Sequence, residues 1–467
     1  MSTFDPLPGF RDFYPEECQI RNYLFSIWRQ VARRHNFAEY ATPTLQRTDI
    51  FIEKSGPEIV GQLFNFKDKG EREVTLPPEV TPYVAQMVGA KASALKRPIR
   101  WFSIPQCFRY ERMQKGRGRE FYQLNYDIFD EAGTTAEVEI LALTIDIFKA
   151  LGLTVNDFAV RLSDRTLWLS FLEGFLGQSR ENALKILQII DKWDRDPAEE
   201  IKNKLNEFNF PEDADYILKG YIEPSISPAS GFTDILYLYA SDLIKIKSFS
   251  GLEDFANRLI KNAEKSKAGI DKATAFLSRL DDWRSLLADL SALGLADFIQ
   301  VDLGIVRGLA YYTGFVFEVF EKTGQGRALA GGGRFDTLVK KLGGPDMPAV
   351  GCAMSDVATL PIFTEKGLLP KFVQSCDLYL VYTSDTTRAR ALQLLPQLRQ
   401  AGFSVEVSLK PLGFGKQMKQ ADKAGARKAV IIGDDELAKG ICKLKCLTSG
   451  EEREVALEKL VDELRSC

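Results

Sequence analysis

The clearest chemical signal in this chain is an alternation of polar and apolar residues over positions 120–129. Gln123, Asn125 and Asp127 occupy odd positions, and the even positions from 122 to 128 are tyrosine, leucine or isoleucine. Successive side chains of a strand point to opposite faces. The pattern therefore predicts a strand whose apolar face packs on a core and whose other face presents two amides and a carboxylate to a cleft. An ordinary sheet with one solvated face is the alternative explanation.

A second predicted strand, from Ile99 to Glu111, precedes this one, and a basic loop joins the two. Arg109 and Glu111 share one face of that strand. Between positions 96 and 119 there are eight lysines and arginines against one acid, and between 410 and 428 six against one. Either run alone could be a solvated face. Two separated basic patches on a chain of net charge −3 indicate an extended polyanion that contacts two domains.

The counts of histidine and cysteine exclude several kinds of chemistry. His35 is the single histidine of the chain, which excludes a multi-histidine metal site and argues against Ser-His-Asp or Cys-His catalysis. Seven cysteines, none spaced C-x-x-C, favour reduced thiols over disulfides or zinc. We expect no metal held by the protein alone, no membrane helix and no secretory signal, and therefore a cytoplasmic location.

The chain of 467 residues suggests about three domains, and its periodicities indicate where they lie. Short apolar runs between turn residues at 58–86, together with the hairpin at 99–129, indicate antiparallel sheet. A long stretch after position 137 is overwhelmingly helical and carries no chemical motif, and sheet character resumes near Phe298. We predict an α+β catalytic domain made of residues 1–160 and 300–362, interrupted by a helical insertion at 161–299.

The last 95 or so residues have a different rhythm. Strand and helix patterns alternate from Asp377 to Arg465, which predicts a separate α/β domain at 374–467 with a mainly parallel sheet. Before this domain, Gly331, Gly332 and Gly333 form a triplet that we predict between a strand and a helix. Such glycines allow either close approach of the backbone to a ligand or a tight turn.

Several ordered motifs make the sequence recognisable. The stretches FRYE (108–111) and FYQ (121–123), joined by the basic loop, resemble motif 2 of class II aminoacyl-tRNA synthetases, and LGIVRGLAYYTG (303–314) resembles the histidyl-tRNA synthetase family specifically. Further segments that match this family are LPGFRD (7–12), PEVTP (78–82) and GGGRFD (331–336). The resemblance covers nearly the whole chain. It implies a class II synthetase fold with a helical insertion and a C-terminal α/β anticodon-binding domain.

The resemblance also implies an activity. Histidine would be activated with ATP to histidyl-adenylate and then transferred to tRNA(His), with Mg²⁺ bridging the phosphates. The attacking carboxylate is ionised near neutral pH, so this reaction needs no base and depends on positioning and charge neutralisation. Arg109 and Arg307 would be catalytic, meeting the α-phosphate from two sides. The family is homodimeric, and the segment near Pro43 resembles its interface motif.

Matching the motifs residue by residue predicts three sets of site residues. Those that would bind histidine are Glu79, Thr81, Gln123, Asp127, Tyr311 and Tyr312. Those that would bind ATP are Arg109, Glu111, Arg117, Arg119, Phe121 and Arg307. Those that would contact tRNA are Gln114, Lys115, Lys416 and Lys419.

The sequence departs from the family pattern at three places. Pro77 stands where arginine is usual, and Asp127 replaces glutamate, which shortens the reach by one methylene but keeps the charge. In motif 3, Val357 and Ala358 replace a Glu-Arg pair whose arginine normally contacts the γ-phosphate. We therefore expect either a divergent subgroup, in which Arg334 or a loop arginine takes over that contact, or a weakened catalyst.

Two other functions compete with ligation of histidine to tRNA. The first is a non-catalytic, histidine-sensing regulatory subunit of ATP phosphoribosyltransferase. Such relatives typically lack the anticodon domain and the motif 2 charges, whereas this chain has both the C-terminal domain and Arg109. The second is a plain RNA-binding module built on the C-terminal part, which would leave the motifs at 99–129 and 307–336 unexplained. Both observations favour the synthetase.

Overall fold

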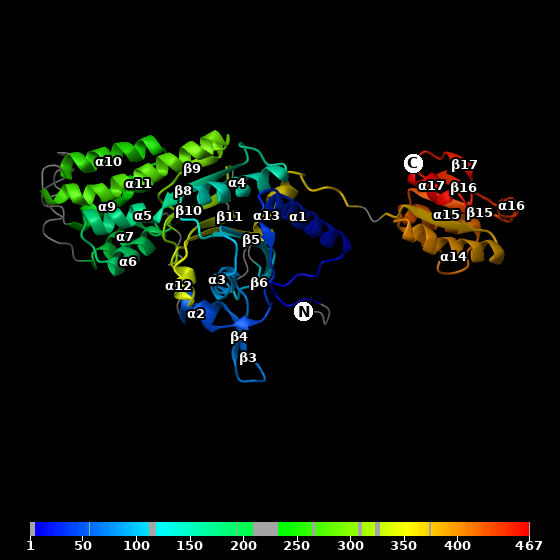
Figure 1. Ribbon diagram of the computed structural model, residues 1–467, viewed down its shortest axis with the longest axis horizontal. Coiled ribbons are helices and arrows are strands. Elements are labelled where there is room, and N and C mark those ends of the chain that lie inside the picture. Colours follow the sequence, from blue (N-terminus) through cyan, green and yellow to red (C-terminus); the bar gives the residue numbers. More distant parts are fainter. Residues whose placement is uncertain are drawn as a thin grey trace. The chain divides into compact units, whose positions relative to one another are not determined.

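The computed structural model describes residues 5–55, 57–111, 118–193, 195–208, 232–263, 267–306, 311–322, 327–372 and 375–466. The chain divides into two compact units. The first comprises Met1–Asp12 and Arg21–Leu369, and the second comprises Phe13–Ile20 and Pro370–Cys467. Figure 1 labels the elements of both units.

A large, mainly antiparallel sheet forms the centre of the first unit. Its strands lie in the order β1 (Ala38–Glu39), β5 (Ile99–Ser103), β7 (Glu120–Phe129), β12 (Ala349–Ser355), β11 (Ala330–Arg334), β10 (Phe315–Glu321), β8 (Phe158–Asp164) and β9 (Ile299–Val301), and β6 (Gln106–Phe108) also pairs with β7. Only the outer pairs β1–β5 and β8–β9 are parallel in this sheet. The predicted α+β domain with an antiparallel sheet is confirmed.

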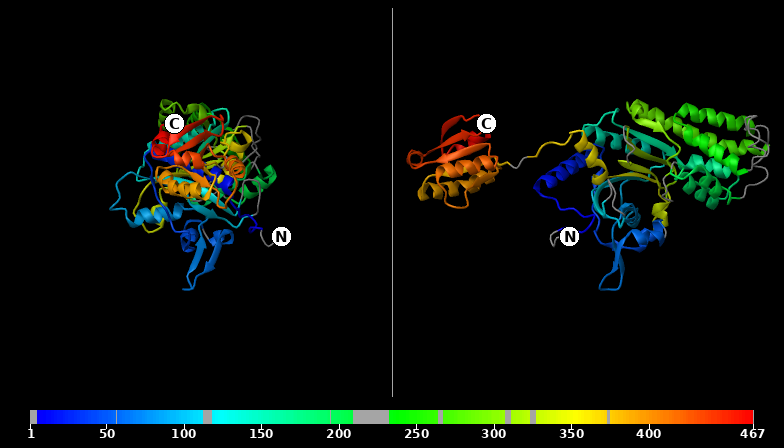
Figure 2. Two further views of the ribbon diagram at one scale, coloured as in Figure 1. Left: turned by 90° about the vertical axis from the view of Figure 1, so that its right-hand side faces the viewer. Right: turned by 180° about the vertical axis from the view of Figure 1, so that it is seen from behind.

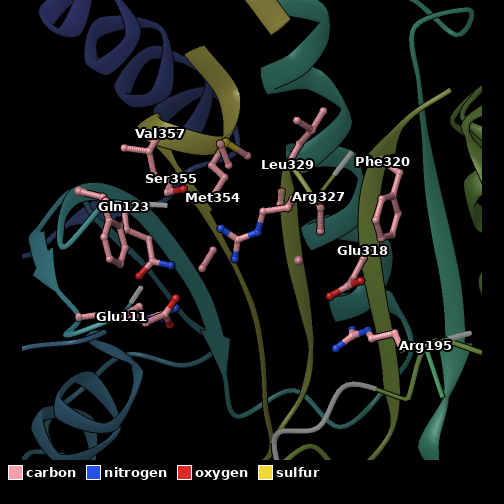
Figure 3. Close-up of a pocket in the computed structure, with 18 residues that line it drawn as sticks. Glu111, Gln123, Arg195, Glu318, Phe320, Arg327, Leu329, Met354, Ser355 and Val357 are labelled. Carbon is pink, nitrogen blue, oxygen red and sulfur yellow. The ribbon is translucent and has the colours of Figure 1, made fainter. Parts of the chain in front are cut away.

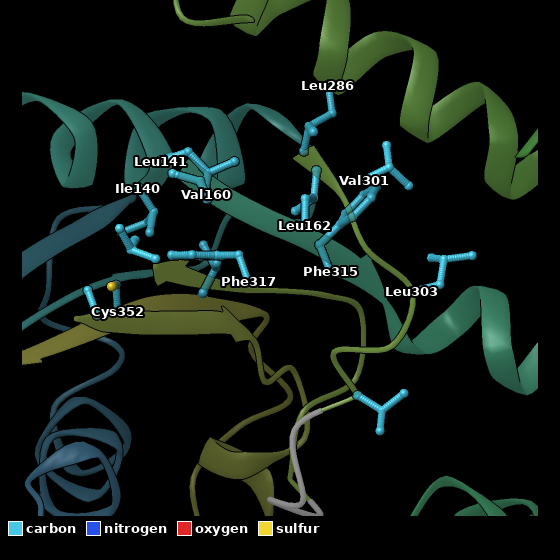
Figure 4. Close-up of a cluster of buried hydrophobic side chains, with 14 of the residues drawn as sticks. Ile140, Leu141, Val160, Leu162, Leu286, Val301, Leu303, Phe315, Phe317 and Cys352 are labelled. Carbon is cyan, nitrogen blue, oxygen red and sulfur yellow. The ribbon is translucent and has the colours of Figure 1, made fainter. Parts of the chain in front are cut away.

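Helices cover the apolar face of this sheet. They are α1 (Pro15–Arg34), α4 (Thr135–Ala150) and α13 (Asp356–Glu365), whereas the short α12 (Leu338–Lys341) packs beside residues 81–90. Ile140 and Leu141 of α4 point toward Val160 and Phe317 of the sheet (Figure 4), and all four are fully buried. His35 follows α1, and its ring nitrogens lie 3.0 Å from Glu139 and 3.3 Å from Asp146 of α4. The lone histidine therefore has a structural role.

A small sheet and two helices lie beside the large sheet. The strands are β2 (Gln46–Arg47), β4 (Glu73–Leu76) and β3 (Phe64–Lys67), and the helices are α2 (Asp49–Ser55) and α3 (Thr81–Ala90), with a 3-10 turn η1 (Pro57–Gln62). Antiparallel pairing here follows the prediction for residues 58–86. The segment between β4 and α3 carries Glu79, and the first residue of α3 is Thr81; both line a pocket with residues of the large sheet.

A group of helices follows β8 and gathers beyond the β8–β9 end of the large sheet (Figures 1 and 2). Its members are α5 (Arg165–Leu169), the π-helix η2 (Ser170–Phe175), α6 (Arg180–Ile190), α7 (Ala198–Leu205), α9 (Phe232–Lys245), α10 (Phe249–Ala263), α11 (Lys267–Ala292) and the 3-10 turn η3 (Ala296–Phe298). The group begins directly after Asp164, at the end of β8. The Asp164 Oδ1 atom caps α5, the first helix of the group, by accepting from the N–H groups of Thr166 and Leu167.

The second unit has a five-stranded sheet in the order β14 (Val405–Val407), β13 (Leu378–Tyr382), β15 (Lys428–Ile432), β16 (Ile441–Cys446) and β17 (Glu452–Ala456). Its helices are α14 (Asp385–Gln400), α15 (Phe414–Lys423), α16 (Asp434–Ala438) and α17 (Leu460–Arg465). The first three strands are parallel, as predicted, but β16 and β17 are antiparallel. Strand β17 was not predicted, and its side chains are exposed apart from Val455.

Two local predictions were wrong. The expected strand Ile99–Glu111 is broken between β5 and β6 at Ile104 and Pro105, because proline has no N–H to donate to a sheet ladder. The glycine triplet lies inside β11 and not between a strand and a helix. A Cβ at Gly332 would come within 2.2 Å of the carbonyl oxygen of Gly351 on β12. Gly332 is therefore required by the close packing of strands, not by a turn.

Candidate active site

A cavity of about 170 Å³ opens where β7, β11 and β12 meet, and we call it the inner pocket. Its polar wall consists of Glu79, Thr81, Arg109, Gln123, Asn125, Asp127, Tyr311 and Tyr312, and Gly331, Phe335, Gly351, Cys352 and Ala353 complete it. The prediction that the odd positions of the strand at 120–129 face a cleft is confirmed. All six residues predicted to bind histidine line this one pocket.

Asp127 is the most unusual group of the inner pocket. It is 1% exposed, and burial raises the pKa of its carboxyl to about 8, against the opposing effect of Lys54. Among the residues that the structure describes, its Oδ2 atom has no hydrogen-bond partner. A buried polar atom without a partner costs free energy. The inner pocket is thus suited to a ligand that hydrogen-bonds to this carboxyl.

Gly351 makes room for that carboxyl. It is paired with Asp127 across β12 and β7, and a Cβ at this position would come within 1.9 Å of the Asp127 Oδ1 atom. Any side chain here would have to displace the carboxyl, because such a distance is far below van der Waals contact. The aromatic rings of Tyr311 and Tyr312, with centroids 4.4 Å apart, form part of the remaining wall.

A larger cavity of about 540 Å³, which we call the outer pocket, adjoins the inner one. Its volume is typical of a pocket for a drug-sized or cofactor-sized ligand. Glu111, Arg195, Glu318 and Arg327 supply charge, Phe121 and Phe320 supply aromatic surface, and Val357 and Ala358 form an uncharged part of the wall. Figure 3 shows the Arg327 side chain pointing into this pocket. The two pockets share Arg109, Gln123, Gly331 and Ala353.

Arg109 lies where the two pockets meet. Its Nε atom donates to the carbonyl of Pro78 at 3.0 Å, and its guanidinium lies 5.2 Å from the centroid of the Phe121 ring. These contacts hold the planar group at the junction. A guanidinium there can contact an anion in either pocket or a group that bridges the two.

The remaining predicted residues have other positions. Arg119 does not line either pocket; its Nε donates to the Glu111 carbonyl at 3.4 Å, and its guanidinium lies 4.3 Å from the Tyr110 ring centroid. Lys416 and Lys419 are exposed on α15 of the second unit. Gln114, Lys115, Arg117 and Arg307 lie outside the described residues.

Sequence reasoning missed three charged residues of this region. Arg195 and Arg327 line the outer pocket, and Lys54 is buried against Glu79. The altered motif 3 predicts that a loop arginine takes over the contact with the γ-phosphate. Arg327, which lies in the loop before β11, is an arginine of this kind. The other suggested substitute, Arg334, is wrong: it forms buried hydrogen bonds to Glu137 on α4 and does not line either pocket.

The described residues also bear on metals and membranes. None of their His, Cys, Asp and Glu side chains form a group of three that could hold a metal ion. Within the same residues, no helix is long and apolar enough to cross a membrane. Glu111 and Glu318 nonetheless place carboxylates in the outer pocket. One or two carboxylates together with substrate phosphates are the ligands that Mg²⁺ usually takes.

Comparison with known proteins agrees with this geometry. Residues 9–358 match the family described as histidyl-tRNA synthetase, and residues 377–466 match the family described as anticodon binding domain. The histidine–tRNA ligase of Opitutus terrae is 46% identical over 460 residues, which are 98% of each chain. That of Haloarcula marismortui is 36% identical over 456 residues, 97% of this chain and 96% of the relative.

A solved structure shows the same fold. The crystal structure of histidyl-tRNA synthetase from Nostoc sp. PCC 7120 superposes with a TM-score of 0.73 at 24% identity, over 99% of both chains. The resemblance inferred from the motifs at 108–123 and 303–314 is confirmed, and so is the class II fold with its C-terminal anticodon-binding domain. On the family match and the 46% identity across nearly the whole chain, this protein belongs to the histidyl-tRNA synthetase family.

Proposed function

We propose that the inner and outer pockets form one active site, in which histidine in the inner pocket reacts with ATP in the outer pocket. As a member of its family, the chain is an aminoacyl-tRNA ligase that joins histidine to tRNA with ATP as a substrate. In the first step a carboxylate oxygen of histidine attacks the α-phosphorus, the bond to the bridging oxygen breaks, and pyrophosphate leaves. Arg109, at the junction, would neutralise the two anions that must meet.

The inner pocket would select histidine by its polar groups. Asp127 and Tyr312 would hydrogen-bond the two imidazole nitrogens, and Glu79, Thr81 and Gln123 would bind the α-amino end. An amino acid without the ring nitrogens would leave the buried carboxyl unpaired, which is a strong filter. Tyr311 would complete the wall beside the ring.

The outer pocket would hold ATP. Phe121 would stack on adenine and Glu111 would hydrogen-bond it, while Arg327 and Arg195 would neutralise the outer phosphates beside the uncharged Val357 and Ala358. Mg²⁺, which neutralises phosphate charge when bound, would be held by the phosphates and Glu318. From the family resemblance we also assign Arg307 to the α-phosphate and Arg117 and Arg119 to the outer phosphates, for which the Arg119 side chain would have to leave its contact with Tyr110.

The contacts with tRNA are inferred from the family pattern and from charge. Gln114 and Lys115 would meet the acceptor end, and Lys416 and Lys419 on α15 would meet the anticodon region. We also retain as predictions a homodimer, a cytoplasmic location and the division into residues 1–160 with 300–362, 161–299 and 374–467.

The observation that carries the assignment of the active site is the buried Asp127 Oδ2 atom, which has no hydrogen-bond partner among the described residues, in a pocket that shares Arg109 with the outer one. A histidine-dependent exchange of labelled pyrophosphate into ATP tests it. We expect exchange in the wild type and loss of exchange in Arg109→Ala and Arg307→Ala without loss of the fold. Binding of histidine without any exchange would instead favour the regulatory-subunit alternative, which is otherwise less supported because residues 377–466 match the anticodon binding domain.

A further inference from the structure

Lys54 is a buried cation that the active site described above does not use. Its side chain is 0% exposed at the end of α2, and its Nζ donates to Oε2 of Glu79 at 2.5 Å. Lysine is almost never fully buried unless it is paired. Lys54 does not line the inner pocket, whereas Glu79 does. It can therefore affect a ligand there only through its neighbours.

Those neighbours lie on two walls of the inner pocket. The Lys54 Nζ atom is 3.9 Å from the centroid of the Tyr311 ring, a cation–π contact, while it donates to Glu79 on the other side. Its charge also opposes the effect of burial on Asp127. Burial lowers the pKa of Lys54, and the Glu79 carboxylate opposes that effect. One ammonium group thus connects three of the residues predicted to bind histidine.

We infer that Lys54 is a positioning residue for histidine, which holds the Glu79 carboxylate oriented to accept the α-ammonium of the substrate. The inference rests on the proposed function, in which Glu79 binds the α-amino end. A carboxylate accepts several hydrogen bonds, so donation by Lys54 leaves capacity for a second donor. Without Lys54, the half-buried Glu79 carboxylate loses a charge-assisted hydrogen bond that fixes its orientation toward the pocket.

The local pairing of charges agrees with this role. The Glu79 carboxylate would lie between two cations, Lys54 and the α-ammonium of histidine, while Arg109 at the junction would meet the carboxylate of histidine. The contact of Lys54 with Tyr311 would in addition keep that ring at the wall of the pocket. Removal of Lys54 should therefore weaken the binding of histidine and not that of ATP, whose pocket it does not line.

The test is steady-state pyrophosphate exchange by the full chain with histidine and ATP varied separately. We expect Lys54→Met to raise KM for histidine about 10- to 100-fold, the loss of one charge-assisted hydrogen bond, with KM for ATP changed less than about 3-fold. Lys54→Arg, which keeps the charge, should recover part of the loss. In a Glu79→Gln background, Lys54→Met should add less than about 3-fold, because both changes remove the same interaction. Lys67→Met, at an exposed lysine paired with Glu71, is the matched control and should have no effect.

Equal increases in both KM values, full additivity with Glu79→Gln, or an unchanged KM for histidine would overturn the inference. If Lys54→Met does not fold, Lys54→Gln, which retains a hydrogen-bond donor without the charge, is measured against the same criteria. Failure of the proposed function is a separate result, because it would appear as absence of exchange in the wild type. In that case calorimetric binding of histidine to the same variants decides the role of Lys54.

Discussion

At the scale of single residues, the affinity of the inner pocket for histidine depends on the proton of the Asp127 carboxyl. Burial raises the pKa of Asp127 to about 8, whereas free imidazole has a pKa of about 6.5. Between these values the carboxyl is protonated and the imidazole is neutral, so the carboxyl can donate its proton to the unprotonated ring nitrogen while the ring N–H remains available to Tyr312. Above about pH 8 this proton is lost from the carboxyl, and below about pH 6.5 the free ligand binds an extra one.

We therefore expect the affinity for histidine to be greatest between about pH 6.5 and 8 and to decline as the pH rises above 8. Asp127→Asn should weaken binding about 10- to 100-fold near neutral pH and make the alkaline decline shallower, because the amide does not titrate and only the α-ammonium of the ligand still does. Titration calorimetry from pH 5.5 to 9.5 measures both effects. Asp130→Asn, at a carboxylate paired with Arg97 beside the same strand, is the control. An alkaline decline as steep in Asp127→Asn as in the wild type would contradict this account.

Arg327 is the second residue whose role can be isolated. It points into the outer pocket, where Val357 and Ala358 contribute no charge. We expect Arg327→Ala to raise KM for ATP about 10- to 100-fold with a small effect on KM for histidine, since it removes a charge-assisted contact with the phosphates. Exchange kinetics give both constants. Arg72→Ala, at an exposed arginine paired with Asp68, should leave them unchanged, and an unchanged KM for ATP in Arg327→Ala would rule out the role.

At the scale of elements, one carboxylate joins the helical group to the large sheet. Asp164 at the end of β8 is fully buried, and its Oδ2 atom accepts from Arg279 Nε at 2.5 Å and from Trp283 Nε1 at 2.9 Å, both on α11. Its Oδ1 atom caps α5, accepting from the N–H of Thr166 at 2.9 Å. The first and last parts of the helical group are thus held at the same strand end.

Asp164→Asn should destabilise the fold by about 2–4 kcal/mol, because it removes the buried one of the two carboxylates paired with the largely buried Arg279 guanidinium and weakens the cap of α5. Denaturant unfolding monitored by circular dichroism measures this loss. Asp281→Asn removes an exposed partner of Arg284 on the same helix and should cost less than about 1 kcal/mol. Similar unfolding midpoints for the two variants would show that Asp164 does not join these elements.

At the scale of the whole molecule, the two units carry different parts of the function. Both pockets belong to the first unit, whereas α15 belongs to the second. Gln417 is buried on α15 and donates to the carbonyls of Tyr382 and Leu412 at 2.8 and 2.7 Å. This anchor orients the helix so that Lys416 and Lys419 face solvent. The predicted contacts with tRNA can therefore be removed without any change at the pockets.

We expect Lys416→Ala combined with Lys419→Ala to raise KM for tRNA and to reduce the salt dependence of tRNA affinity by about two in logarithmic slope, while pyrophosphate exchange stays normal. Aminoacylation and filter binding at several salt concentrations measure these effects. The double variant Lys439→Ala and Lys459→Ala, at exposed lysines elsewhere in the unit, is the control. A salt slope equal to that of the wild type would place the contacts elsewhere.

The sequence alone determined the features that have a local period or an ordered motif. The alternation at 120–129 placed Gln123, Asn125 and Asp127 on one face, and the strand–helix rhythm after Asp377 predicted the second unit, because both patterns depend only on neighbours in the chain. The motifs at 108–123 and 303–314 supplied the family.

Only the tertiary structure decided which charged residues meet. Lys54, Arg195 and Arg327 lie far apart in the sequence and have no periodic signal, yet Lys54 is buried at the inner pocket and both arginines reach the outer one. Arg334, which the sequence made an equally good candidate for phosphate binding, is instead paired with Glu137. Burial makes a charge costly unless partners offset that cost. Those partners come from distant parts of the chain that only folding brings together.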